Sequence, residues 1–204
     1  MVFGAGVAGL QAIATAKRLG AIVSATDVRM AAKEQVESLG GKFVMVEDDE
    51  AEDAETSTGY AKEMSDDFKL KQAKLISDTL ASQDIAICTA LIPGKKAPRL
   101  ISKEQVNSMK PGSVIIDLAA ESGGNCECSK PGETIEENGV IVVGSKNITS
   151  TISQDASSLF SKNILNFVNI LIDDETKNLV IDWEDEIIKG ILITKDKKIM
   201  NEEF

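Results

Sequence analysis

Short apolar runs alternate with amphipathic stretches through the first 172 residues. The apolar runs are bounded by turn residues and are typical of buried strands, and the segments between them repeat apolar residues at helical spacing. The predicted strands are Val2–Phe3, Ala21–Thr26, Phe43–Val46, Asp84–Ala90, Ser113–Leu118 and Val140–Val143. The predicted helices are Ala8–Arg18, Met30–Leu39, Ser65–Ala81, Ser102–Met109 and Ala156–Ile172. This alternation predicts an α/β fold with a doubly wound, mostly parallel sheet over residues 1–172.

The pattern changes in residues 173–204. Leu179–Trp183 and Ile187–Thr194 alternate apolar and polar residues, which predicts a C-terminal β-hairpin tail. An isolated hairpin is marginal in water, so its apolar face is expected to pack on another domain or on a partner chain. We expect this tail to contribute to the interface of a homodimer.

Three glycines stand between the first strand and the first helix. Gly4, Gly6 and Gly9 have the spacing G-x-G-x-x-G, directly after Val2–Phe3 and at the start of the helix Ala8–Arg18. In a dinucleotide site the first glycine permits the tight turn, the second lets the pyrophosphate approach the backbone, and the third lets helix and strand pack closely. The helix N-terminus would supply N–H groups to the phosphates.

An acidic residue follows at the expected distance. Asp27 ends the second predicted strand, about 20 residues beyond the glycines, where a carboxylate holds a ribose 2′-hydroxyl. The same charge would repel a 2′-phosphate, so the sequence favours NAD(H) over NADP(H). The structural alternative is a tight strand–helix turn with a surface aspartate. Glycines, strand, helix and Asp27 together favour a Rossmann-type NAD(H) site.

The first strand is unusually short. Buried strands usually have about five residues, yet only Met1, Val2 and Phe3 precede Gly4. We therefore expect the chain to begin inside a larger protein.

The composition excludes several classes of partner. The chain has 204 residues, a net charge of −11 and 4% aromatic residues. This charge disfavours nucleic acid and anionic membranes as ligands. No stretch reaches the 18 or more apolar residues of a spanning helix, so a cytoplasmic location is expected.

The chemistry of the chain is restricted by what it lacks. It has no histidine, the commonest general acid and base near neutral pH. Its three cysteines are Cys88, Cys126 and Cys128, which we interpret as reduced thiols rather than as zinc ligands. The segment Glu47–Glu55 contains seven acids and is interpreted as a solvated, mobile loop.

Several stretches together resemble one family. They resemble the NAD(H)-binding domain of the α subunit of proton-translocating NAD(P) transhydrogenases, a family related to alanine dehydrogenase. The stretches are Gly4–Gly20, Asp27–Arg29, Gly59–Met64, Thr89–Gly94, Asp117–Cys126 and Ala156–Phe167. The resemblance runs essentially from end to end. The sequence departs from the family pattern in the turn Ser145–Thr151.

The resemblance implies a set of nucleotide contacts. The pyrophosphate would be cradled by Gly4, Ala5, Gly6, Val7, Ala8 and Gly9. Asp27 would hold the adenosine ribose, flanked by Val28 and Arg29. Tyr60 would lie on a mobile loop that closes over the nucleotide. The nicotinamide side would be lined by Thr89, Ala90, Leu91 and Pro93.

The resemblance also implies a function. NADH would transfer a hydride to NADP⁺ bound on a partner subunit, in a complex with membrane-spanning subunits, a separate N-terminal α piece and a second copy of this domain. The complex would place the chain at the cytoplasmic side of the inner membrane. Glu121 stands where alanine dehydrogenases have a catalytic aspartate, and it is equally interpreted as a surface acid. Two alternatives stay open: a fragment of an alanine dehydrogenase-like enzyme, and a non-catalytic NAD-binding module.

Overall fold

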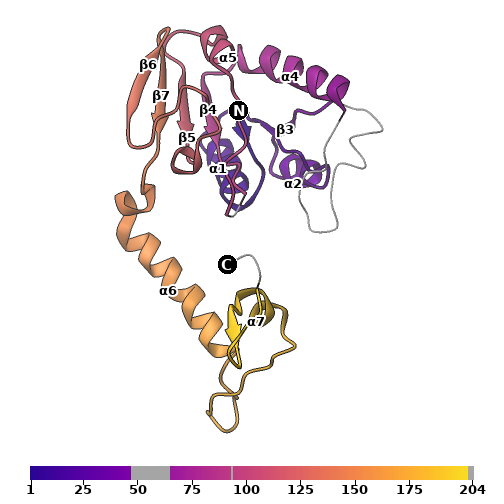
Figure 1. Cartoon of the computed structure of the whole chain (residues 1–204). Helices are drawn as coiled ribbons and strands as arrows, with labels where there is room; N and C mark the ends of the chain where they lie inside the picture. Colours follow the sequence, from indigo (N-terminus) through magenta and orange to yellow (C-terminus); the bar gives the residue numbers. More distant parts are fainter. Residues whose placement is uncertain (47–64, 93, 202–204) are drawn as a thin grey trace. The chain divides into compact units, whose positions relative to one another are not determined.

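The computed structural model describes residues 1–46, 65–92 and 94–201 (Figure 1). Tyr60, Pro93 and the acidic segment 47–55 lie outside the described residues. The chain divides into two compact units, Met1–Ile148 and Thr149–Phe204, which are described separately. The helix that we predicted as the end of the first domain falls in the second unit. A domain boundary near residue 172 in the whole protein stays a prediction.

A seven-stranded sheet forms the first unit, in the order β3-β2-β1-β4-β5-β7-β6. All pairs are parallel except β6 with β7. The strands are β1 (Val2–Phe3), β2 (Ser24–Thr26), β3 (Lys42–Phe43), β4 (Ile85–Cys88), β5 (Val114–Asp117), β6 (Thr134–Glu137) and β7 (Val140–Gly144). β1 lies between β2 and β4. The chain adds β2 and β3 on one side of β1 and then continues with β4 and β5 on the other side, so the order in which strands are added reverses at β1. The predicted Rossmann-type fold is confirmed.

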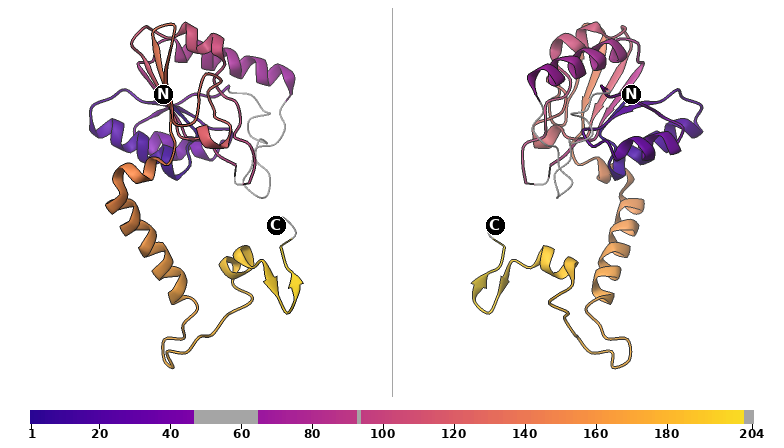
Figure 2. Two further views of the ribbon diagram at one scale, coloured as in Figure 1. Left: turned by 60° about the vertical axis from the view of Figure 1, so that its left-hand side comes forward. Right: turned by 90° about the vertical axis from the view of Figure 1, so that its right-hand side faces the viewer.

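Helices cover both faces of the sheet, as the two views in Figure 2 show. They are α1 (Val7–Arg18), α2 (Ala32–Ser38), α4 (Asp66–Leu80) and α5 (Lys103–Ser108). Ile13 of α1 and Val36 of α2 pack with Val2 on one face, and Leu80 of α4 and Val106 of α5 pack with Phe3 on the other. Both faces of β1 are therefore buried, which explains why parallel strands have continuous apolar runs.

One strand of the sheet was not predicted. β6 is the antiparallel edge strand, and its sequence Thr134–Glu137 contains two glutamates and one isoleucine. Ile135 packs against the core, while Thr134 and Glu136 are exposed. An edge strand with one covered face needs few apolar residues, so the sequence pattern was too weak to reveal it.

The short helix η2 (Ile148–Ile152) begins at the last residue of the first unit. The second unit contains α6 (Ser153–Asn169), α7 (Glu186–Ile191), β8 (Thr194–Lys195) and β9 (Lys198–Ile199). A two-stranded antiparallel appendage is confirmed, but its strands are β8 and β9. The predictions of strands over Leu179–Trp183 and Ile187–Thr194 were both wrong. The first segment has only an isolated bridge from Leu179 to Ile172, and most of the second is α7. The Asp185 carboxylate caps this helix by accepting hydrogen bonds from the N–H groups of Ile187 and Ile188.

The second unit has little core of its own. Ile188 is its only buried residue among those described between 149 and 201. Large apolar side chains are exposed along α6, among them Leu159, Phe160 and Leu165. In the described portion of the chain, no helix combines the length and apolar character needed to cross a membrane.

Candidate functional site

The glycine loop has the geometry that its spacing predicts. Gly4 adopts a φ of +94°, and its N–H donates to the carbonyl oxygen of Thr26 at 2.9 Å. A Cβ at Gly4 would lie 2.9 Å from the Thr89 hydroxyl oxygen, and a Cβ at Gly9 would overlap the carbonyl oxygen of Gly4. Both positions therefore require glycine because of the backbone turn and the close approach of helix to loop.

The second glycine is different, because it faces open space. A Cβ at Gly6 would have no other atom within 4 Å. Gly6 is the N-cap of α1 without any side-chain cap among the described residues, and Val7 and Ala8 in the first turn are exposed. The first N–H groups of this 12-residue helix therefore point to a surface that an anion can reach.

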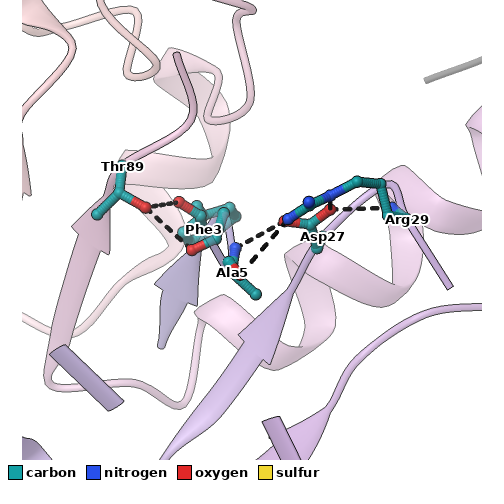
Figure 3. Close-up of polar contacts among 6 residues, drawn as sticks. Phe3, Ala5, Asp27, Arg29 and Thr89 are labelled. Carbon is teal, nitrogen blue, oxygen red and sulfur yellow. Dashed lines mark hydrogen bonds and ion pairs between the residues drawn. The ribbon is translucent and has the colours of Figure 1, made fainter. Parts of the chain in front are cut away.

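Asp27 lies directly beside this loop (Figure 3). Its Oδ2 accepts a hydrogen bond from the Ala5 N–H at 2.7 Å, and its Oδ1 accepts from the Arg29 N–H at 2.9 Å. The Arg29 guanidinium donates two further hydrogen bonds to this carboxylate, from Nε to Oδ1 at 3.0 Å and from Nη2 to Oδ2 at 3.2 Å. Burial raises the pKa of Asp27, but these hydrogen bonds and the Arg29 charge outweigh burial and hold the pKa below its ordinary value.

The carboxylate thus has four donors for its two oxygens, which is about its full capacity. Two of these donors are backbone groups of Ala5 and Arg29. The other two belong to the Arg29 side chain, which is 33% exposed. A ribose hydroxyl that binds Asp27 would therefore replace or share the guanidinium contacts. Val28, between Asp27 and Arg29 in the chain, is exposed.

The exit of β4 meets the glycine loop from the other side. The Thr89 hydroxyl donates toward the carbonyl oxygens of Phe3 and Gly4, at 3.1 and 2.9 Å (Figure 3). Ala90 and Leu91 follow, and Leu91 lines a hollow of about 510 Å³. The other lining residues are Ile92, Gly94, Lys95, Lys96 and Ser122. Its size is within the range of ligand pockets.

Glu121 lies on the 3-10 turn η1 (Ala120–Ser122) and is exposed. Its Oε2 accepts a hydrogen bond from the Asn147 N–H at 2.9 Å. The carboxylate therefore contacts the turn after β7.

Two buried polar residues near the site were not predicted. Asp117, at the end of β5, accepts hydrogen bonds from the N–H groups of Ala119 and Cys126 at 2.9 and 3.0 Å. Asn125 binds the backbone of Ala90 and Pro98. Both side chains are fully buried. In the sequence, Asp117 stands out only as a polar residue within the apolar strand predicted over Ser113–Leu118, and Asn125 only as part of the stretch Asp117–Cys126 that resembles the family.

The three cysteines differ in exposure. Cys88 and Cys126 are buried, and Cys128 is partly exposed. Burial raises the pKa of all three thiols, that of Cys126 to about 11. Among the described residues no group of three or more histidine, cysteine, aspartate or glutamate side chains is arranged to hold a metal ion.

Comparison with known proteins identifies the family. The sequence profile of the alanine dehydrogenase/PNT C-terminal domain matches residues 1–202. The chain belongs to this family. It is 58% identical over 201 residues to the first piece of NAD(P) transhydrogenase subunit alpha in Rhodospirillum rubrum, covering 98% of this chain and 52% of that protein. It is 49% identical to the Rickettsia prowazekii protein of the same name, again over 98% of this chain and 51% of that protein.

Solved structures of the family agree in fold. The crystal structure of transhydrogenase from Sinorhizobium meliloti superposes with a TM-score of 0.78 at 48% identity, over 97% of this chain and 51% of that one. L-alanine dehydrogenase is more distant, with a TM-score of 0.65 at 26% identity, over 86% of this chain and 44% of that one. The resemblance predicted from the motifs is confirmed. The chain spans about half the length of the relatives that it matches.

Proposed function

We propose that this chain is the NAD(H)-binding portion of a proton-translocating NAD(P) transhydrogenase. The observation that supports this proposal best is the 58% identity over 98% of the chain to a transhydrogenase α subunit, against 31% over 61% for an alanine dehydrogenase of Staphylococcus aureus. The glycine loop with its adjoining aspartate supports NAD(H) as the nucleotide.

The dinucleotide would cross the sheet where β1 separates β2 from β4, the switch point at which such ligands bind. Its pyrophosphate would lie on the N-terminus of α1, against Gly6. The adenosine ribose would lie on Asp27, whose charge disfavours a 2′-phosphate. The nicotinamide would lie at the exit of β4, beside Thr89 and the hollow that begins at Leu91. We also propose Tyr60 and Pro93 as residues that contact the nucleotide, as the family resemblance implies.

The reaction class fits the residues of this chain. NADH supplies a hydride, and its transfer to a second nicotinamide releases no substrate proton, so no general base is needed. The chain has no histidine, and Glu121 contacts a neighbouring turn. The protein would therefore contribute to the reaction by positioning the two nicotinamide rings and by excluding water.

Partners follow from the same proposal. NADP(H) would be bound by another subunit, and the proton would be moved by membrane-spanning subunits that hold the chain at the cytoplasmic side of the membrane. A separate N-terminal α piece would complete the nucleotide site. The exposed apolar side chains of the second unit support a homodimer as well.

The second candidate is an alanine dehydrogenase-like enzyme, which the family match and the 31% identity favour. It would need an acid–base group and a cation for the substrate carboxylate. A third candidate is a module that binds NAD(H) without catalysis.

One experiment separates the three. The chain is mixed with an NADP(H)-binding transhydrogenase subunit, and hydride transfer from NADH to thio-NADP⁺ is followed by absorbance. We expect turnover that needs both components, and no turnover by the chain alone. Oxidation of NADH that depends on pyruvate and ammonium would instead support the second candidate. Binding of NADH without either reaction would support the third.

A further inference from the structure

Asn125 makes three hydrogen bonds with its buried side chain, all to backbone groups far away in sequence. Its Oδ1 accepts from the Ala90 N–H at 3.1 Å, and its Nδ2 donates to the carbonyl oxygens of Ala90 and Pro98 at 2.9 and 2.8 Å. The side chain is 0% exposed. A buried amide with this many partners fixes the backbone groups that it binds, because losing it leaves them unpaired in a dry environment.

The backbone that Asn125 holds is the exit of β4. Ala90 lies between Thr89, whose hydroxyl binds the glycine loop, and Leu91, which lines the hollow. Pro98 lies at the far end of the same connection. One side chain therefore holds both ends of the segment whose residues border the hollow.

Asn125 is itself held in place by the exit of β5. The Asp117 carboxylate accepts hydrogen bonds from the N–H groups of Ala119 and Cys126 and so closes the turn that contains Asn125. The carbonyl oxygen of Asn125 also accepts from the N–H groups of Leu100 and Ile101, at 2.7 and 3.0 Å. The amide is thus preorganised by contacts on both sides.

The strand order indicates which half of a dinucleotide this network serves. Asp27 and the adenosine ribose would be on the β2 side of β1, so the other half of the ligand would lie on the β4 side. The hydrogen bonds of the Asn125 side chain all go to this second side. Its contacts with Ala90 are separate from those of Asp27 with Ala5.

We propose that Asn125 is a positioning residue for the nicotinamide half of NAD(H), acting through the backbone of Ala90. This inference rests on the proposed function. Loss of the Asn125 amide should therefore weaken the binding of the nicotinamide half of NAD(H) and leave the binding of the adenosine half unchanged.

The test compares NADH with 5′-AMP, which carries only the adenosine half, on the full chain. Asn125→Ala should weaken NADH binding at least tenfold in a fluorescence titration and leave the 5′-AMP dissociation constant, from calorimetry, within twofold. Asn138→Ala is the matched control. Asn138 has a φ of +51° and an exposed side chain with one hydrogen bond to the Asn107 carbonyl. It lies in the β6–β7 turn, so its replacement should lower the melting temperature without changing either affinity.

The outcomes are distinguishable. If the wild type binds neither ligand, the proposed function falls and this inference with it. If the wild type binds both, but Asn125→Ala binds NADH equally well or loses both ligands in proportion, only the role of Asn125 is overturned. Should the alanine variant not fold, Asn125→Asp keeps the size and the acceptor while removing both donors, and the same selective loss is expected. Failure of both variants to fold would make Asn125 a residue of the fold alone and would overturn the proposal.

Discussion

Two substitutions that each add one methyl group to the glycine loop should affect different properties, one the stability of the fold and the other the binding of nucleotide. Gly9→Ala and Gly6→Ala add the same group three residues apart. At Gly9 the new Cβ would overlap the carbonyl oxygen of Gly4, whereas at Gly6 it would have no other atom within 4 Å. The first change should therefore destabilise the fold, and the second should act on the ligand.

The cost at Gly9 follows from the overlap. The atom that it meets is backbone, so helix α1 must move away from the loop, and Thr89 Oγ1 at 3.1 Å restricts that movement. Overpacking of this kind costs about 1–3 kcal/mol, and the gain of about 1 kcal/mol from alanine in a helix offsets only a fraction of it. Because the obstacle is a backbone carbonyl, we expect a cost at the upper end of this range, about 3 kcal/mol, and so a net loss of about 2 kcal/mol in the free energy of unfolding.

The cost at Gly6 should appear only with nucleotide. Its φ of −76° and ψ of −167° are allowed for alanine. Reduced freedom of the unfolded chain should leave stability unchanged or raise it by up to about 1 kcal/mol. The methyl would occupy the surface where a pyrophosphate must approach, so NADH binding should weaken at least about tenfold, or about 1.4 kcal/mol.

Urea denaturation followed by circular dichroism measures stability, and quenching of NADH fluorescence measures binding. We expect a folded Gly6→Ala variant that binds NADH poorly and a destabilised Gly9→Ala variant. A Gly6→Ala variant that binds NADH as well as the wild type would refute the assignment of this loop to the pyrophosphate.

Other substitutions and conditions test separate features. Asp27→Ala should weaken NADH binding by about 1–2 kcal/mol, the scale of a charge-assisted hydrogen bond, and a wild type with equal affinity for NADH and NADPH would contradict the role of this carboxylate. The pKa of Asp27 is lowered in the folded chain, so the stability that its charge provides should be complete above about pH 4 and be lost as the pH falls through the lowered pKa. The difference in urea midpoint between the wild type and Asp27→Asn should therefore shrink below about pH 4. A difference that stays constant with pH would contradict this contribution of the Asp27 charge. At about pH 8, near the ordinary thiol pKa, Ellman's reagent should modify Cys128 before Cys88 and Cys126. Those two thiols are buried, and burial raises their pKa values. Rapid modification of all three thiols in the native chain would be inconsistent with this burial. Light scattering should find a dimer for the full chain and a monomer for a chain ending at Asp173, and the tail does not contribute to the interface if both have the same oligomeric state.

Much of the fold could be predicted, because parallel strands buried on both faces have apolar runs that are easy to recognise. β4 and β5 lie within one or two residues of their predicted limits. β6 was missed since an edge strand needs few apolar residues. α7 was predicted as a strand because Ile187 and Ile191 fit either period, and the decision depends on the cap at Asp185, which alternation does not reveal.

Residue patterns alone predicted the glycine loop and Asp27, whereas Thr89, Ala90 and Leu91 were predicted from the family resemblance. The three glycines have roles fixed by local backbone geometry, and Asp27 has a fixed distance from them. The Arg29 fork on Asp27 was not predicted, since it depends on a side-chain rotamer. Asn125 was missed because its partners are 27 and 35 residues away, and only the sheet brings them together.

In the proposed complex, NAD(H) binds across β1, from Asp27 to the exit of β4. Amide chemical shifts of the ¹⁵N-labelled chain, recorded during titration with NADH, test it most directly. We expect the largest shifts at Gly6, Val7, Arg29, Ala90 and Leu91, with much smaller shifts at the same concentration of NADPH. Shifts that leave Gly6 and Val7 unchanged, or that are the same for NADH and NADPH, would contradict it.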